Sequence, residues 1–452
     1  MTSAADPIQV WHSLIRAGVE GTPEYWQELS SRMRAARLTF GDRPLCPFLR
    51  PFFLSSAEAA RVAPVCEAIA AMGERVVRAA MESPALLRDV RLTPAEERLV
   101  RIDPGYGCAS TSSRLDAFLL PDSLKFAEYN AESPAGLAYS ENLAGIFDNL
   151  EIMAGFRQQF ETRSFRLSDA ILDALLESYR EWGGTANPPT ILITDWREVP
   201  TWSEFEILQA RFEARGVPTV VADPRDLSFD GNVLVAADRR IDMIYRRVLM
   251  TDLVARPDEC AALLRAVESG RICMANSLRC KIPHKKAFFA VLTGERHAHL
   301  FSPSEQAIIR NHIPWTRIVE DTRTTWEGET VDLLSAIRRR RERLVLKPND
   351  EYGGSGVTLG WEATTSAWDD AIERAVSDPS SAWVVQERIP VRREPFPVMT
   401  GTGIELREML VDFAPYIFRG RQHGYLTRLS TSGLANVTSG GGQVPTFVIH
   451  QP

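Results

Sequence analysis

Residues 344–361, LVLKPNDEYGGSGVTLGW, combine an apolar strand that ends in a lysine with a glycine-rich loop and a second apolar strand. A P-loop would place Gly-Lys-Ser/Thr at the start of a helix, and a dinucleotide-binding fold would also run from strand into helix. Here Val357, Thr358 and Leu359 continue the strand pattern after the glycines. The stretch therefore predicts a hairpin that covers phosphates, which is typical of enzymes that use nucleoside triphosphates.

The residues of this loop are suited to an anion. Gly353, Gly354 and Gly356 allow positive φ and bring bare N–H groups close to a ligand. Lys347 adds a point charge for phosphate oxygens. From this stretch alone, an ordinary glycine-rich hairpin with a surface lysine is an equal alternative.

A second hairpin is predicted far upstream, in residues 112–136, SSRLDAFLLPDSLKFAEYNAESPAG, with its turn at residues 121–123. Opposed carboxylates on a strand face repel each other unless a cation or a proton lies between them. Asp116 and Glu128, with the Asn130 amide, form an all-oxygen set suited to Mg²⁺ that keeps waters and bridges phosphates. A solvated hairpin end is the alternative. For a three-residue turn centred on Asp122, the facing pairs are Leu120–Leu124, Phe118–Phe126, Asp116–Glu128 and Arg114–Asn130.

These motifs together resemble the circularly permuted ATP-grasp proteins, in the branch similar to glutathionylspermidine synthetase. The usual ATP-grasp order places the metal-ligand strands after the lysine and the glycine loop, whereas here they come first. Circular permutation produces this order, and the similarity covers residues from about 100 to the C-terminus. In chain order the motifs are Arg114-Leu-Asp116, Glu128-Tyr-Asn130, Lys286, Lys347 with its glycine flap, Gln386-Glu387, Arg428 and Asn436.

The resemblance implies a mixed α+β and α/β fold, a circularly permuted ATP-grasp with a helical N-terminal layer and a small α/β substrate-side (pre-ATP-grasp) domain. The residue pattern agrees with it, because residues 188–223 alternate strand, helix and strand, for which a right-handed crossover is expected. The expected domains are a helical region at 1–100, the metal-ligand hairpin with its helices at 101–185, the pre-ATP-grasp domain at 186–270, the nucleotide-binding subdomain with its glycine flap at 271–400, and the completion of the ATP-grasp C-subdomain at 401–452.

The resemblance also implies the residues of the site. Asp116, Glu128 and Asn130 match the magnesium ligands, and Arg114 matches a catalytic arginine near the reacting phosphate. Arg428 is a second catalytic candidate, for the acyl phosphate or a substrate carboxylate. The residues implied to bind ATP are Lys286 (with Lys285 as the alternative), Lys347, the flap residues Tyr352, Gly353, Gly354, Ser355 and Gly356, the hinge residues Gln386, Glu387 and Ile389, and Asn436.

The activity that the resemblance implies is ATP-dependent joining of a carboxylate to an amine through an acyl phosphate, with release of ADP and phosphate. ATP and Mg²⁺ are the expected cofactors, and small-molecule or peptide acids and amines are the expected substrates. An ATP-grasp kinase and a noncatalytic ATP-binding scaffold are the alternatives. No Cys/His hydrolase region of suitable length precedes residue 100, so an amidase half is not expected, and the glutathione and spermidine substrates are not transferred to this chain.

Composition agrees with an enzyme of the cytosol. The 452 residues are 44% hydrophobic and 25% charged, which is enough for two or three domains with proper cores. A net charge of −7 argues against nucleic acid as a partner. The N-terminus lacks a basic and then apolar signal stretch, and no run approaches the length of a membrane span, so a cytoplasmic location is expected.

The cysteines and two arginines have simpler explanations than catalysis. None of the six cysteines has metal-site spacing, and Cys108, just before the metal hairpin, is expected to be a buried thiol. Arg246 and Arg247 close a strand pattern, where a substrate carboxylate is one partner, and an ion pair with Asp242 or Asp252 is the other.

Overall fold

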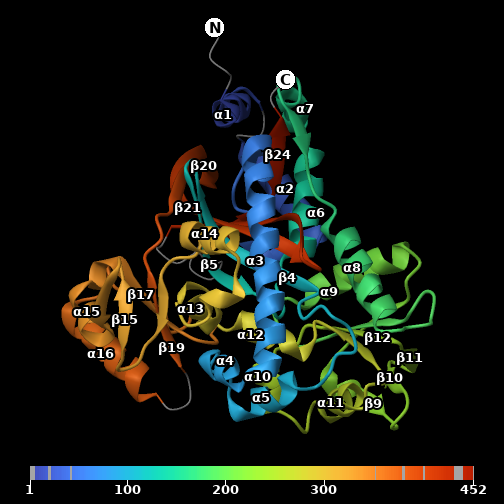
Figure 1. Ribbon diagram of the computed structural model, residues 1–452. Helices are drawn as coiled ribbons and strands as arrows, with labels where there is room; N and C mark the ends of the chain where they lie inside the picture. Colours follow the sequence, from blue (N-terminus) through green and yellow to red (C-terminus); the bar gives the residue numbers. More distant parts are fainter. Residues whose placement is uncertain are drawn as a thin grey trace.

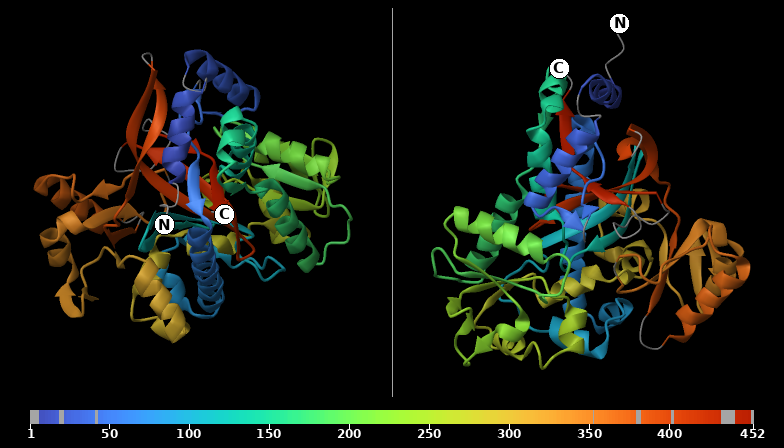
Figure 2. Two further views of the ribbon diagram at one scale, coloured as in Figure 1. Left: turned by 90° about the horizontal axis from the view of Figure 1, so that it is seen from above. Right: turned by 180° about the vertical axis from the view of Figure 1, so that it is seen from behind.

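The computed structural model of the chain is built around one six-stranded sheet, with smaller sheets and helices on either side of it (Figure 1). It describes residues 6–18, 22–40, 43–351, 353–378, 382–400, 403–431 and 441–450. Figure 2 shows the same arrangement from above and from behind. In the described part of the chain, no helix is long and apolar enough to cross a membrane.

The central sheet joins the hairpin at residues 112–130 to strands from the end of the chain. Its order is β23-β22-β21-β4-β5, with β20 also paired to β21, and all its pairings are antiparallel. Ala117 of the hairpin lies opposite Phe413, and Arg114 lies opposite Tyr416. The chain end therefore completes the sheet that the hairpin begins, as the permuted motif order predicts. The strands are β4 (Ser112–Leu120), β5 (Ser123–Asn130), β20 (Arg392–Thr400), β21 (Gly403–Phe418), β22 (Arg421–Ser430) and β23 (Gly442–Val444).

The predicted register of the β4–β5 hairpin is right at its open end and wrong at its turn. The pairs Asp116–Glu128 and Arg114–Asn130 are present. The loop holds only two residues, however, so Leu120 pairs with Ser123 and Phe118 with Lys125. A β-bulge after Asp116 leaves Ala127 without a partner and restores the register. The extra residue of the bulge, rather than a third turn residue, brings the two carboxylates opposite each other.

The glycine-rich stretch lies in a second antiparallel sheet of order β14-β19-β17-β18. Helices cover one side of it, and a separate small core of Leu344, Leu346, Val385, Trp368 and Ile372 fills the space between. The elements of this region are α12 (Lys281–His284), α13 (Ala287–Thr293), α14 (Pro303–His312), β14 (Thr316–Ile318), β15 (Arg323–Trp326), β16 (Glu329–Asp332), α15 (Leu333–Arg339), β17 (Leu344–Pro348), β18 (Thr358–Leu359), α16 (Thr365–Ser377) and β19 (Trp383–Glu387).

The strand–helix–strand unit predicted in residues 188–223 is confirmed as β7, α9 and β8. It belongs to a four-stranded parallel sheet of order β13-β12-β7-β8. The elements here are α8 (Leu167–Glu181), β7 (Ile191–Thr194), α9 (Trp202–Ala214), β8 (Thr219–Ala222), β9 (Ser228–Phe229), β10 (Leu234–Ala236), β11 (Arg239–Ile241), β12 (Met243–Arg246), α10 (Met250–Ala255), α11 (Ala261–Glu268) and β13 (Cys273–Ala275).

The N-terminal segment is mostly helical, and its long helix α3 runs through the middle of the molecule (Figure 1). A capping box between Ser55 and Glu58 starts that helix. The segment is also tied to the chain end, because β3 pairs in parallel with β24, which pairs with β6 on its other side. The elements of this segment are α1 (Pro7–Ala17), α2 (Pro23–Ala35), β1 (Thr39–Phe40), β2 (Arg43–Pro44), β3 (Phe52–Ser55), α3 (Ser56–Glu82), α4 (Pro84–Asp89) and α5 (Pro94–Val100). The later elements beside it are α6 (Leu137–Asp148), α7 (Glu151–Phe156), β6 (Glu161–Arg163) and β24 (Thr446–His450).

Candidate active site

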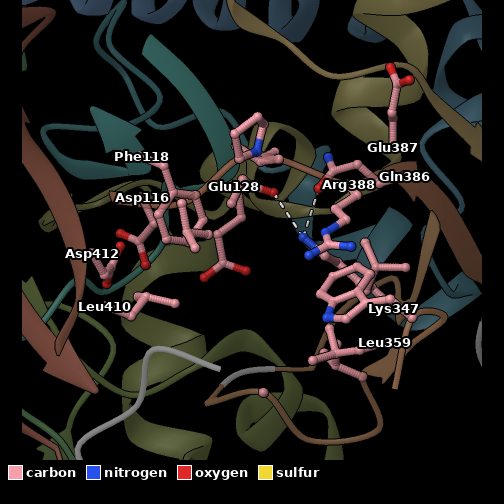
Figure 3. A pocket seen from close by; sticks show the side chains of 18 of the residues that line it. Asp116, Phe118, Glu128, Lys347, Leu359, Gln386, Glu387, Arg388, Leu410 and Asp412 are labelled. Carbon is pink, nitrogen blue, oxygen red and sulfur yellow. Dashed lines mark hydrogen bonds between the residues drawn. The ribbon is translucent and has the colours of Figure 1, made fainter. Parts of the chain in front are cut away.

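A cavity of about 460 Å³ lies between the central sheet and the β14-β19-β17-β18 sheet (Figure 3). Two segments that are far apart in the sequence therefore form its opposite walls. Predicted site residues in its lining are Asp116, Glu128, Lys286, Lys347, Gly353, Gly354, Gln386, Glu387, Ile389 and Arg428. Tyr352 and Asn436, which were predicted to bind ATP, lie outside the described residues.

The predicted metal ligands lie together at the open end of the β4–β5 hairpin. The Asn130 Nδ2 donates to Asp116 Oδ2 at 3.1 Å and to Glu128 Oε1 at 3.0 Å, so the amide sits between the two carboxylates. Burial opposes the charged form of Glu128, but Lys286 and Lys347 hold its pKa below the ordinary value. The hairpin thus presents two ionised oxygen donors to the cavity.

An alternating row of charges extends from these ligands across the sheet. Arg114 pairs with both oxygens of Asp116, at 2.7 and 3.0 Å, and Arg428 Nη2 donates to the same carboxylate at 2.7 Å. Arg428 also pairs with Asp412, its register partner on β21. Burial would raise the pKa of Asp116, yet the two arginines hold it well below its usual range.

Asp412 lines the cavity and was missed by the sequence analysis. Burial, with the neighbouring charge of Asp116, raises its pKa to about 6 although Arg428 opposes the shift. The only sequence signal is one carboxylate within an apolar run of strand β21.

Arg114 does not lie in the cavity lining. Its guanidinium is drawn back by Asp116 and by the Ala135 carbonyl, to which Nη1 donates at 2.9 Å. Of the two arginines predicted to be catalytic, Arg428 therefore lines the cavity and Arg114 does not.

The lysines differ sharply in their surroundings. Lys286, the residue before α13, lines the cavity with its Nζ 3.6 Å from Glu128 Oε2. Lys285 instead donates to Glu96 and Asp350, both at 2.8 Å, in a buried ionic cluster outside the cavity lining. Of the two alternatives, Lys286 is the one that the fold brings to the carboxylates.

The β-bulge of the hairpin also serves Lys347. The Ala127 carbonyl, which the bulge leaves unpaired, accepts from Lys347 Nζ at 3.2 Å, and Gln386 Oε1 accepts at 2.7 Å. Neither partner is charged. Burial, with the nearby charge of Lys286, lowers the pKa of Lys347 to about 8. Lys347 is half-buried, and although the charge of Glu128 is nearby, both of its hydrogen-bond acceptors are neutral, so its ammonium is suited to take an anion as a direct partner.

The glycine flap and the hinge strand close the remaining sides. Gly353, Gly354 and Gly356 have φ of 64°, 79° and 70°, which residues with a side chain rarely adopt. Gly353 and Gly354 line the cavity, whereas Gly356 and the exposed Ser355 lie outside the lining. In Figure 3 the Glu387 carboxylate points away from Glu128 and Lys347, and it pairs with Arg343 at 2.8 Å. Gln386 is buried and donates to Thr316.

The residues present fit a divalent cation, with one rearrangement. The described residues hold no group of three or more His, Cys, Asp and Glu in metal-binding geometry. The third oxygen here comes from an amide, and the Asn130 NH₂ already occupies the place between the carboxylates. A half-turn of the Asn130 side-chain amide would break its two hydrogen bonds to the carboxylates and turn its oxygen toward them. That oxygen would complete the oxygen set that Mg²⁺ prefers.

Arg246, Arg247 and Cys108 have structural partners. Arg246 pairs with the buried Glu132 at 2.9 Å, and not with Asp242 or Asp252. The Nη2 of Arg247 donates to the Pro134 carbonyl. Cys108 is half-buried, and burial together with Glu74 raises the pKa of its thiol.

A family model described as circularly permuted ATP-grasp type 2 matches residues 122–438. The chain belongs to that family. A glutathione synthetase-like effector from Globodera pallida shares the fold, with a TM-score of 0.61 and 12% identity over 98% of each chain. The permuted ATP-grasp fold predicted from the motif order is therefore confirmed.

The curated relatives match this chain over only part of their own length. An uncharacterized protein of Mycobacterium tuberculosis is 25% identical over an alignment of 345 positions, which covers 71% of this chain and 57% of that protein. A protein of Frankia casuarinae named as a candidate glutamate–cysteine ligase is 24% identical over an alignment of 336 positions, which covers 67% of this chain and 36% of that protein. The chain spans about half the length of the mycobacterial relatives it matches.

Proposed function

We propose that the chain is an ATP-dependent carboxylate–amine ligase that works through an acyl phosphate and releases ADP and phosphate. The observation that carries the proposal is one cavity in which Lys286, Lys347 and Arg428 face the carboxylates of Asp116 and Glu128. Cations and oxygen ligands in one enclosed space are what a nucleoside triphosphate with its metal ion requires. Membership of the ATP-grasp family and the name of the Frankia relative support the same reaction class.

The proposed chemistry has two steps. A carboxylate oxygen of the acid attacks the terminal phosphorus of ATP, and ADP leaves. The amine nitrogen then attacks the acyl carbon, the carbon–oxygen bond to phosphate breaks, and the amine gives up one proton. When bound, Mg²⁺ would neutralise phosphate charge and align the phosphates for attack.

The chain's own residues would take the following parts. Glu128 and Asp116, with Asn130, would hold the metal ion. Lys286 and Lys347 would bind phosphate oxygens, and Arg428 would stabilise the charge on the transferred phosphoryl group. Arg114 would orient Asp116 through its two hydrogen bonds. This role is indirect, whereas the resemblance implies that the arginine lies near the reacting phosphate.

The flap that contains Gly353 and Gly354 would exclude water from the acyl phosphate, which hydrolyses easily. The glutathionylspermidine-synthetase branch, the pairing of substrates and a cytosolic location stay predictions. Glutamate and cysteine, from the name of the Frankia relative, are the first acid and amine to test.

Calorimetric titration with ATP, with and without Mg²⁺, tests the nucleotide assignment. We expect micromolar binding that Mg²⁺ strengthens, that Lys347→Ala abolishes, and that Glu128→Gln makes independent of Mg²⁺. Lys125→Ala is the matched control, because Lys125 is on β5 but outside the cavity lining. Equal binding by Lys347→Ala and wild type would contradict the assignment.

Release of ADP and phosphate in the presence of acid and amine pairs then tests the reaction class. A ligase releases free phosphate only when both substrates are present. A kinase would instead leave the phosphate on a product, and ATP binding without turnover over a broad panel would favour a noncatalytic scaffold.

A further inference from the structure

A tryptophan and an arginine are stacked inside the cavity, and none of the predicted roles includes them. The guanidinium carbon of Arg388 lies 4.4 Å from the centre of the Trp361 ring system. Both residues line the cavity, together with the apolar side chains of Val345, Leu359 and Ile389. In Figure 3 Arg388 lies on the side of the cavity that carries Lys347 and Leu359, away from Asp412.

The backbone around Trp361 is held rigidly. Gly360 N donates to the Leu344 carbonyl at 3.0 Å, and its own carbonyl accepts from Arg341 Nη1 at 2.7 Å. A Cβ on Gly360 would lie 2.0 Å from the Arg341 carbonyl oxygen, so only glycine fits at this position. The backbone therefore places Trp361 directly after the flap strand β18, where its side chain lines the cavity.

The backbone of Arg388 is fixed by a hydrogen bond, whereas its guanidinium stacks on Trp361. Its N–H donates to the Arg343 carbonyl at 2.7 Å, which places it at the end of the hinge strand β19. Among the ion pairs of the described residues, none includes Arg388, although the adjacent Glu387 pairs with Arg343. The side chain is exposed, so the guanidinium can move without breaking an ion pair.

We propose that Trp361 and Arg388 clamp the nucleobase of a purine nucleoside triphosphate, which enters between the indole and the guanidinium. The inference rests on the proposed function and adds to it the group that recognises the base. A guanidinium and a purine are both flat and both stack on an aromatic face, so the present contact marks a surface of the right shape. Lys347 and Glu128, which would hold the phosphates and their metal ion, line the same cavity. The two-ring purine covers more of the indole than a pyrimidine does.

Calorimetry with ATP, GTP and CTP on four variants tests the clamp. Loss of base–aromatic stacking predicts binding of ATP that is weaker by about tenfold or more in Trp361→Leu. Trp361→Phe should recover most of that loss, because it restores an aromatic face. Arg388→Ala should weaken ATP several-fold and Arg388→Lys less, and the preference for ATP and GTP over CTP should shrink in Trp361→Leu.

Tryptophan fluorescence distinguishes contact between Trp361 and the base from a purely structural role of Trp361, because only contact lets ATP quench the emission of this residue. The chain has ten tryptophans, so ATP should quench only part of the wild-type emission, and Trp361→Phe should lose that part while it still binds ATP. If Trp361→Leu fails to fold, two other measurements still decide the question. They are the quenching of Trp361→Phe fluorescence by ATP and the ATP affinity of the variants at the exposed Arg388.

Three results would overturn the clamp. The first is wild-type affinity for ATP in Trp361→Leu, and the second is quenching that Trp361→Phe retains. The third is tighter ATP binding by Arg388→Ala, which would make the guanidinium a competitor of the base. In all three the wild type binds ATP, so the proposed function survives. No ATP binding by the wild type would overturn both.

Discussion

Lys347 is the residue on which we expect ATP binding to depend most, because its half-buried ammonium has only neutral oxygens as hydrogen-bond acceptors. Its pKa, lowered to about 8, means that it carries its charge below pH 8 and loses it above. ATP affinity should therefore fall as the pH rises through about 8, and Lys347→Arg should remove the fall, since arginine stays charged. Calorimetry between pH 7 and pH 9 measures this. The same decline in Lys347→Arg would assign the titration to another group.

Asp412 predicts a second pH effect, on stability. Its pKa is raised from 3.8 to about 6 in the folded chain, so the folded state binds the extra proton and stability from this group falls as the pH rises from about 4 to 6. Asp412→Asn lacks the titrating carboxyl. Relative to wild type, the variant should gain unfolding free energy across this window, as measured by urea denaturation. A constant difference between pH 4 and pH 6 would contradict the assignment.

The sequence reveals some of these residues and hides others for a physical reason. Asp116 and Glu128 were predictable because they lie opposite each other on the two strands of one hairpin with a short turn. Asp412 is a single carboxylate in an apolar strand, and the charge of Asp116 that acts on it comes from the distant strand β4. Arg388 lies just after a strand, and its stacking partner Trp361 comes from a separate strand end. Local patterns carry no trace of such contacts.

At the scale of elements, strand and helix identities were predictable but the register was not. The strand–helix–strand unit at residues 188–223 follows from apolar runs and turn residues, and the structure has it. The β4–β5 turn was wrong by one residue, because the alternation of side chains does not tell a longer turn from a bulge. The bulge also frees the Ala127 carbonyl for Lys347, a link between two sheets that a hairpin pattern cannot show.

The base of the flap is anchored to helix α13 by one buried side chain. Asn349 Oδ1 accepts from Ala287 N at 2.8 Å, and its Nδ2 donates to the Val90 carbonyl at 3.2 Å. Asn349→Ala leaves both groups buried without a partner, which we expect to cost about 1–3 kcal/mol of unfolding free energy. It should also weaken ATP binding, because Lys286 directly precedes this helix.

Urea denaturation and calorimetry measure the two effects of Asn349→Ala. Asn232→Ala is the matched control, since Asn232 is an exposed residue in the bend before β10, and it should change neither quantity. Lost stability with unchanged ATP affinity would separate the anchor from the site.

For the whole molecule, the order of motifs along the chain was the most informative feature. Ligand strands that precede the lysine and the flap require that the chain end return to the first sheet, and β21 does pair with β4. The sequence did not show that the N-terminal segment shares this closure. Its strand β3 pairs with β24, and its helix α3 holds the segment just before β4, where Glu74 accepts from the N–H groups of Ala109 and Ser110.

This closure predicts that the molecule unfolds as one unit. Phe447 on β24 is fully buried beside β3 and β6, so Phe447→Ala should cost about 3–5 kcal/mol of unfolding free energy. His450→Ala, on the same strand but half-exposed, is the control. Because Arg75 of α3 also pairs with Glu305 at 2.6 Å, the N-terminal helices should not detach first, and calorimetry should show one transition at a lower temperature. Two separate transitions in Phe447→Ala would instead make the N-terminal layer an independent unit.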